Sequence, residues 1–256
     1  MGIKRHIANL LERLSGNFII PPGELHLMHE QVHLRRFFEY FDVDCVFDVG
    51  ANAGQYATTL REKVGFRGDI ISFEPIPELA EELRVRAASD SRWHIEQLAL
   101  DREAGPSSFN VMANSVFSSL HRPNSHQPEI FASSNNVVRS IPVSRSTIAI
   151  EFAKYRSRLG FHRPYLKIDT QGNDFAVVEG AGEALSEFTG LQSELAIEKL
   201  YDGSTDFADS IAAYVSRGFV LSAFVPNNEG FFPRLIEIDC IMVRRDLAKI
   251  VRERPK

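Results

Sequence analysis

The sequence of 256 residues has few cysteines and no long apolar run. Its two cysteines, Cys45 and Cys240, each lie in a predicted buried strand, so the chain holds no disulfide framework and no thiolate metal cluster. No segment approaches the roughly 18 uninterrupted apolar residues of a membrane-spanning helix. The first residues also lack a charged leader followed by an apolar core and a cleavage site. We therefore expect a cytoplasmic protein with no transmembrane segment.

The chain also lacks an excess of positive charge. It has 29 Lys and Arg residues against 34 Asp and Glu residues, a formal net charge of -5, and no long basic run. Binding to nucleic acid depends on basic side chains that neutralise phosphates, so we expect no nucleic-acid partner. The length is enough for one α/β domain with a short extension, and it is short for two independent domains.

Short apolar segments alternate with helical segments along most of the chain. The predicted strands are residues 43–49, 69–73, 93–100, 165–168, 191–197, 219–225 and 235–243. Alternating strands and helices predict a parallel sheet with helices on both faces. The last two strands are joined by a loop containing Pro226 and Gly230, which favours a hairpin and an antiparallel last strand. The expected fold class is α/β, a Rossmann-like seven-stranded sheet that is mostly parallel, with an antiparallel C-terminal hairpin.

The pattern divides the chain into three parts. We expect an N-terminal helical extension at residues 1–41, a cofactor-binding domain at 42–246 and a C-terminal tail at 247–256. Within the domain, the polar segment 101–143 interrupts the alternation and is expected to form an inserted hairpin or lid. The N-terminal helices include an amphipathic segment that would pack against the domain or against a second copy in a homo-oligomer. A membrane surface is the weaker alternative because the segment has few basic residues.

A turn after the first predicted strand has the form of a cofactor site. The strand ends in Asp48, and the chain turns through Gly50, Asn52 and Gly54 into a helix. In open α/β sheets, ligands bind beyond the carboxyl ends of the strands. Gly50 lets the backbone approach a ligand closely, and Asn52 is one of the few residues that tolerate a positive φ. We therefore expect these four residues to bind the cofactor.

The spacing of this turn argues against a dinucleotide. A dinucleotide fingerprint would place glycines at positions 50, 52 and 55, but Asn52 and Gln55 occupy two of them. An NAD-dependent dehydrogenase is therefore a weak alternative. A nucleoside ligand without a pyrophosphate does not require the same close approach, and it remains the expected cofactor type.

The second predicted strand ends in an acidic residue. Glu74 lies twenty residues beyond Gly54, where a carboxylate can accept hydrogen bonds from both ribose hydroxyls of an adenosyl group. Pro75 and Ile76 follow, and Ile76 can pack against adenine. Asp101, after the third predicted strand, can accept from the adenine amino group. The alternatives are a solvated carboxylate or helix cap for Glu74 and a plain turn residue for Asp101.

A series of short motifs follows in order between about residues 43 and 244. They are Phe47–Gly54 (FDVGANAG), Phe73–Pro75, Ala99–Asp101, Ser118–Leu120, Leu166–Gly172 (LKIDTQG), Glu179–Ala181, Glu194 and Leu200–Tyr201. This set resembles the motifs of the FkbM family of methyltransferases, and the LKIDTQG run is its most specific member. Asn173 and Asp174 stand where the family pattern has an aromatic residue or His followed by Glu.

The resemblance implies a class I methyltransferase fold with S-adenosylmethionine as the methyl donor. It also implies O-methylation of a sugar, a polyketide or a similar small-molecule or glycan acceptor. Ser118 and Tyr201, in two of the motifs, are the expected contacts of that acceptor. The expected function is therefore that of an S-adenosylmethionine-dependent O-methyltransferase. The alternative is a binding module that keeps the cofactor fold without turnover, because no Ser-His-Asp or Cys-His constellation is evident.

Methylation of a hydroxyl needs a positioned base or a metal that lowers the hydroxyl pKa. Asp169, at the tip of its predicted strand, is the first candidate for either role. Alternation in the strand 191–198 places Glu194 and Glu198 on one face, so both are further catalytic candidates. An ion pair with a nearby lysine is the structural alternative for each. Histidines in predicted loops are alternative bases, and a divalent metal is possible, although no ligands can be assigned to it.

Overall fold

The computed structural model describes residues 25–226 and 233–249. The amphipathic segment predicted near the N-terminus and most of the loop predicted before the last strand lie outside the described residues. Among the helices that are described, none combines the length and the apolar character that crossing a membrane requires.

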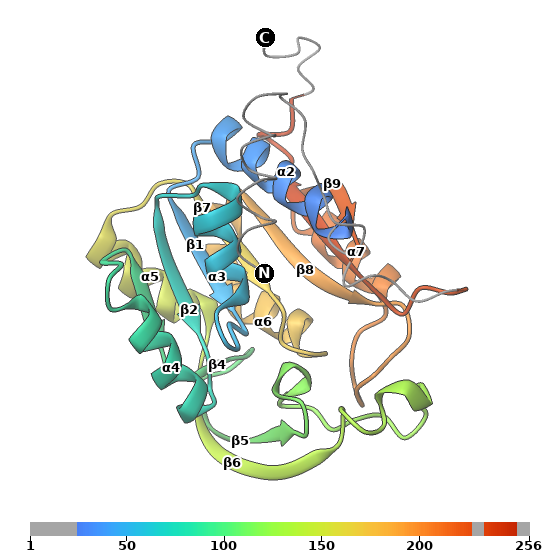
Figure 1. Ribbon diagram of the computed structural model, residues 1–256. Helices are drawn as coiled ribbons and strands as arrows, with labels where there is room; N and C mark the ends of the chain where they lie inside the picture. The colour runs from blue at the N-terminus through green and yellow to red at the C-terminus, as the bar shows by residue number, and fades with distance from the viewer. Residues whose placement is uncertain (1–24, 227–232, 250–256) are drawn as a thin grey trace, which may run out of the picture.

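A seven-stranded sheet forms the centre of the protein (Figure 1). Its spatial order is β3-β2-β1-β7-β8-β10-β9. The strands are β1 (Cys45–Val49), β2 (Asp69–Phe73), β3 (Trp93–Glu96), β7 (Pro164–Ile168), β8 (Gly190–Ala196), β9 (Phe219–Val225) and β10 (Glu237–Arg244). The pairs from β3 to β8 are parallel, whereas β10 is antiparallel to both β8 and β9. The predicted sheet, mostly parallel with an antiparallel C-terminal hairpin, is confirmed.

Helices cover both faces of the sheet (Figure 1). They are α2 (Leu25–Tyr40), α3 (Gln55–Thr59) with the π-helical turn η2 (Leu60–Val64), α4 (Pro77–Ala87), α5 (Ile148–Leu159), α6 (Asp174–Ala181) with the 3-10 segment η5 (Gly182–Glu187), and α7 (Phe207–Ser216). In β1, Phe47 joins the core under α5 and α6, whereas Val46 joins the core under α2 and α3. The strand is buried on both faces, which explains its continuous apolar sequence.

The segment after β3 leaves the main sheet. The single strand predicted at 93–100 is wrong, because β4 (Ala99–Leu100) pairs with β6 (Val137–Ser146) instead of continuing β3. With β5 (Gly105–Met112), these strands form a second sheet in the order β4-β6-β5. Two short 3-10 turns, η3 (Ser115–Phe117) and η4 (Glu129–Phe131), lie between β5 and β6. Figure 1 shows this sheet below the central one.

The carboxyl ends of β1 and β7 lie unusually close together. Asp169 N donates to Val49 O at 3.0 Å, and Gly50 N donates to Phe73 O on the neighbouring strand at 3.1 Å. Gly50 has φ +81°, and a Cβ added there would lie 1.8 Å from Asp169 O. Only glycine fits both the backbone conformation and the approach. This contact places the turn after β1 against the tip of β7.

We predict that Gly50→Ala destabilises the protein far more than Gly65→Ala. Gly65 has φ +83° with nothing within 4 Å of an added Cβ, so its substitution adds only the strain of a left-handed backbone. At Gly50 the same strain is joined by a clash with a backbone carbonyl that cannot move without separating two strands. The loss in the free energy of unfolding should exceed that of the control by at least about 2 kcal/mol in urea titrations. Equal losses would contradict this account.

Candidate active site

A cavity of about 560 Å³ lies at the carboxyl ends of the strands. Its walls are residues 49–52 after β1, 74–76 after β2, 98–100, and 114–118 of the insert, together with polar side chains of β7, β8 and β10. The volume is within the range of small-molecule sites. The turns after β1 and β2 form one end of the cavity, and the polar side chains at the ends of β7, β8 and β10 form the other.

The turn after β1 adopts the conformation that its residues predict. Asn52 has φ +47°, and its side-chain oxygen accepts from Ala53 N at 2.8 Å. Gly54 caps α3 at φ +81° but does not line the cavity. A Cβ on Gly54 would lie 2.7 Å from the side chain of Leu83, so this glycine allows close helix packing.

Glu74 is the central polar group at this end of the cavity. It is 4% exposed, and its two carboxylate oxygens accept from Asn52 N and Ile76 N, each at 2.8 Å. Burial raises its pKa to about 7. Each oxygen retains a second lone pair, so the carboxylate can still accept from two neighbouring hydroxyl groups. Ile76 packs with Phe109 in an apolar wall of the cavity. This combination fits an adenosyl group, with ribose at Glu74 and adenine against Ile76.

Two residues predicted to contact the cofactor lie elsewhere. Asp48 is completely buried behind the turn, accepts from Ser72 Oγ at 2.9 Å, and does not line the cavity. Burial raises its pKa. Asp101 follows β4 rather than a strand of the main sheet, and its carboxylate lies 2.6 Å from the Arg145 guanidinium. The structure therefore gives Asp48 and Asp101 structural partners instead of a place in the cavity wall.

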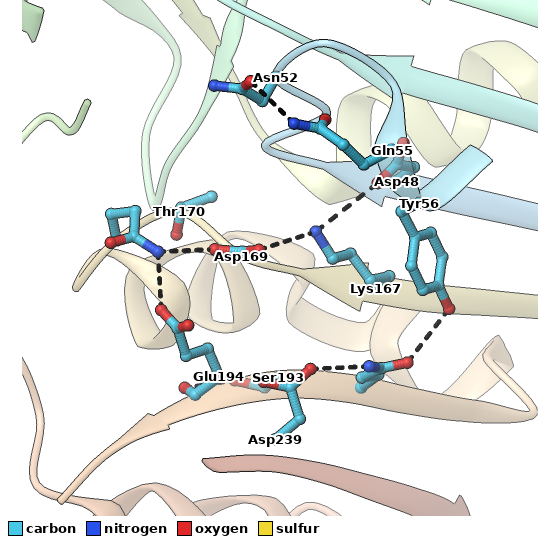
Figure 2. Close-up of polar contacts among 12 residues, drawn as sticks. Asp48, Asn52, Gln55, Tyr56, Lys167, Asp169, Thr170, Ser193, Glu194 and Asp239 are labelled. Atoms are coloured by element: carbon cyan, nitrogen blue, oxygen red, sulfur yellow. Dashed lines mark hydrogen bonds and ion pairs between the residues drawn. The ribbon is translucent and has the colours of Figure 1, made fainter. Parts of the chain in front are cut away.

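The other end of the cavity is built around Asp169 (Figure 2). Its carboxylate accepts from Lys167 Nζ at 3.2 Å and from Gln171 Nε2 at 2.9 Å. The same amide nitrogen donates to Glu194 at 2.8 Å, so Gln171 joins the two carboxylates. Burial opposes the charge of Lys167, but Asp169 and Asp48 outweigh it and raise the lysine pKa.

The residues after Asp169 are fixed by a second set of hydrogen bonds. Gln171 has φ +56°, and its side-chain oxygen lies 2.8 Å from the Tyr201 hydroxyl. Asp174 accepts from Thr170 N at 2.7 Å and from Ser193 Oγ at 3.2 Å. Burial raises the pKa of Asp174 to about 6. Asp174 departs from the family pattern, yet it holds the turn that presents Asp169.

The remaining predicted residues divide between the cavity and its surroundings. Glu194 and Ser118 line the cavity, although Ser118 Oγ accepts from Met112 N. Tyr201 lies behind Gln171 and does not line it. Glu198 lies beyond the end of β8, 3.0 Å from Arg234 Nε, outside the wall. The loop histidines considered as bases, His121, His126 and His162, are also absent from the wall.

Sequence reasoning missed the acidic side chains of β10. Asp239 pairs in register with Glu194 of β8, and Glu237 pairs with Ala196. Alternation along β10 sends Cys240 and Met242 into one core and leaves Glu237 and Asp239 facing the cavity. Burial and neighbouring carboxylates raise the pKa of Glu237 to about 8 and that of Asp239 to about 7. The alternation of polar and apolar residues along β10 can be seen in the sequence, but the pairing of β10 with β8 cannot.

Metal ligation has no candidate cluster in the described part of the chain. Within residues 25–226 and 233–249, no group of three or more His, Cys, Asp or Glu side chains could hold a metal ion. The described residues therefore offer no set of ligands for the divalent metal that the sequence analysis considered possible.

A model of the methyltransferase FkbM domain matches residues 48–221, more than half of the chain. The chain belongs to the FkbM methyltransferase family. The resemblance carried by the sequence motifs is confirmed, and the protein is an S-adenosylmethionine-dependent methyltransferase. No curated protein matches the sequence.

Solved structures with a similar arrangement include three proteins that are distant in sequence. A SAM-dependent methyltransferase from Aquifex aeolicus is 12% identical, with 92% of this chain and 98% of that chain covered and a TM-score of 0.44. Aeropyrum pernix fibrillarin with S-adenosyl-L-methionine is 12% identical, with 84% of this chain and 74% of that chain covered and a TM-score of 0.44. Magnesium protoporphyrin IX methyltransferase from Synechocystis PCC 6803 is 8% identical, covers 95% and 98%, and has a TM-score of 0.44. All three TM-scores are below 0.5, and the family assignment does not depend on them.

We predict that Glu74→Gln weakens the binding of S-adenosylhomocysteine by about 10- to 150-fold, as expected for loss of charge-assisted hydrogen bonds. Isothermal titration calorimetry measures the dissociation constant directly. Glu78→Gln is the matched control, because Glu78 lies at the start of α4 and pairs with Arg139 at the surface. An unchanged dissociation constant for Glu74→Gln would remove Glu74 from the ribose site.

We also predict that Glu237→Gln makes stability less dependent on pH. The folded-state pKa of Glu237 is about 8 against an ordinary 4.5, so the folded protein binds this proton more tightly than the unfolded chain. The associated stability is present below pH 4.5 and is lost as the pH rises to about 8. The variant should therefore gain stability over the parent as pH rises, by at most about 1.4 kcal/mol per pH unit. Urea unfolding at pH 5, 7 and 9 measures this, with the exposed Glu103→Gln as control. A pH-independent difference would contradict it.

Proposed function

We propose that this methyltransferase transfers a methyl group to a hydroxyl of a small-molecule or glycan acceptor, with Asp169 as the base. The observation that carries the proposal is the position of the Asp169 carboxylate. It lies in the cavity wall with its side chain 37% exposed, and Lys167 and Gln171 hold its two oxygens. Each oxygen keeps a lone pair for the proton of an incoming hydroxyl.

The neighbouring carboxyl groups are less suited to be the base. Burial, followed by the charge of Glu237, raises the pKa of Glu194 well above its ordinary value. The raised pKa favours the protonated form of Glu194, which makes it less suited than Asp169 to take up the acceptor's proton. Asp169 is better placed, because it has the ammonium of Lys167 as a partner. Glu194 instead contributes to holding Gln171 and the acceptor.

The donor would be held by Glu74, Ile76 and the turn at Gly50, and when bound it supplies an electrophilic methyl group on sulfur. The acceptor oxygen takes the methyl group, its proton passes to Asp169, and S-adenosylhomocysteine is left. Aligning the two substrates is the main task of the protein. The contact of Gly50 with the Asp169 carbonyl sets the relative position of the two ends of the cavity.

The insert shields this reaction from water. Asn52 Nδ2 donates to Ser115 Oγ at 3.2 Å, and the Tyr201 hydroxyl lies 2.8 Å from Phe117 O. Phe117 packs against Phe131, with ring centroids 5.6 Å apart, so the two short 3-10 turns cover the cavity as one unit. Exclusion of water keeps the lone pair of the acceptor free to attack.

The charge of the cavity disfavours a nucleic-acid acceptor. Beside the single lysine, its acceptor end presents Asp169, Glu194, Glu237 and Asp239. A polyphosphate backbone would be repelled by these groups, and Lys167 is the one basic side chain that the described residues place in this wall. A small neutral or positively charged acceptor fits better.

We predict that Asp169→Asn lowers the methyl-transfer rate by at least about 100-fold, the usual contribution of a general base. Its dissociation constant for S-adenosylhomocysteine should stay within about 3-fold of the parent value, because Asp169 is outside the expected donor contacts. The rate is measured with labelled donor against a panel of sugar, polyketide and lipid-linked acceptors. Asp202→Asn, an exposed carboxylate on a nearby loop, is the control. A parent-like rate for Asp169→Asn would place the base elsewhere, and no transfer by the parent would favour a binding module.

A further inference from the structure

Three carboxyl groups on the strands remain at the acceptor end of the cavity once Asp169 is assigned to the hydroxyl, and Glu30 of α2 lines the wall next to Asp239. Glu194 of β8 and Glu237 and Asp239 of β10, here called the carboxyl trio, share one face of two neighbouring strands. Glu194 and Asp239 are direct cross-strand partners. Like charges in such positions destabilise a sheet, so the folded structure alone gives no reason for this arrangement.

The trio is unevenly supplied with hydrogen-bond donors. Asp239 accepts from Gln192 Nε2 at 2.8 Å, and Glu194 accepts from Gln171. Glu237 is 8% exposed and lines the cavity, yet none of the described side chains donates a hydrogen bond to it or forms an ion pair with it. Buried polar groups normally have partners, so a carboxyl group of this kind points to a donor that arrives with a ligand.

The nearby cations are committed to other carboxylates. Lys167 lies 3.2 Å from Asp169 and 3.9 Å from Asp48, and Arg234 pairs with Glu198. In the described residues, therefore, no lysine or arginine neutralises Glu237. Burial, followed by repulsion from neighbouring carboxylates, raises the pKa of all three members of the trio.

We propose that the acceptor carries a protonated amine beside its reactive hydroxyl, and that Glu237, with Glu194 and Asp239, binds this ammonium group. An amino sugar or another small amino alcohol has this chemistry. An ammonium group has N–H donors and a positive charge, so it can donate a hydrogen bond to Glu237 and be attracted by the neighbouring Glu194 and Asp239. A neutral polyol would supply donors but no charge, and a metal ion finds no ligand geometry in the described residues.

This inference rests on the proposed hydroxyl methylation and deepens it. Asp169 and the trio lie in the same cavity wall, with Gln171 bonded to both Asp169 and Glu194. An amino alcohol bound at the trio would therefore present its hydroxyl toward Asp169. Acylation of the amine would remove the charge and add bulk in a buried location, so N-acetylated compounds should be excluded.

The test is a binding experiment on the full chain saturated with S-adenosylhomocysteine. The probes are glucosamine, N-acetylglucosamine and glucose, together with the smaller pair 2-aminoethanol and ethylene glycol, each titrated up to 50 mM by calorimetry or ligand-observed NMR. We expect the amines to bind at least 10-fold more tightly than their neutral counterparts. Glu237→Gln should abolish that preference, and it should leave the affinity for S-adenosylhomocysteine unchanged.

The matched control is Glu198→Gln, because Glu198 lies just beyond the end of β8, the strand of Glu194, but pairs with Arg234 outside the cavity. It should keep the preference for amines. Equal binding of amine and neutral probes, a preference that survives Glu237→Gln, or no amine binding by the parent protein would each overturn the proposal. Because the readout is binding, it is separate from methyl transfer. A preserved ammonium site without transfer refutes the proposed function alone, and transfer to neutral sugars without amine preference refutes this inference alone.

Discussion

The close approach of Gly50 to the backbone carbonyl of Asp169 is the contact on which the site depends. It joins the turn that would hold the donor to the strand tip that would meet the acceptor. The turn is also tied to β2, because Asn52 N donates to Glu74. Three strand ends are thus fixed relative to one another by backbone groups, which are less adjustable than side chains. Methyl transfer requires alignment above all, and rigid strand ends provide it.

The second constraint is electrostatic. A row of polar residues crosses one face of the sheet. Asp48 of β1, Lys167 of β7 and Gln192 of β8 are successive cross-strand partners in this row. Lys167 pairs with Asp169 and lies 3.9 Å from Asp48, but within the described residues the carboxyl groups of β8 and β10 outnumber the nearby cations. Excess buried charge lowers stability, and such costs are typical of functional sites rather than of structural cores. We therefore expect a ligand with donor groups at the acceptor end of the cavity.

Local sequence order predicted the sheet well, because apolar strands and the turns after them need no knowledge of distant pairing. The prediction failed where an apolar segment looks continuous in the sequence but its two halves pair with different strands. Residues 93–100 read as one strand, yet β3 pairs with β2 and β4 with β6. The helix α5 was also missed, although Thr147 caps it and Ile148, Phe152 and Tyr155 lie on one buried face. It follows β6 with no glycine or proline to mark a boundary.

The same difference between local sequence order and distant strand pairing explains which residues of the site could be predicted. The positions of Gly50, Asn52 and Glu74 at the cavity were predictable because each lies in the turn after a strand, and carboxyl ends of parallel strands meet at one edge. Glu237 was not, because its place also depends on which strand β10 pairs with, and the sequence predicted the antiparallel direction but not the pairing with β8. It stands at the start of β10, and only an antiparallel pairing brings the start of β10 to the end of β8. Had β10 run parallel to its neighbours, Glu237 would lie at the opposite edge of the sheet. The turns after β1 and β2 would thus build the donor end, and the one reversed strand adds Glu237 and Asp239 to the acidic groups that β7 and β8 place at the acceptor end.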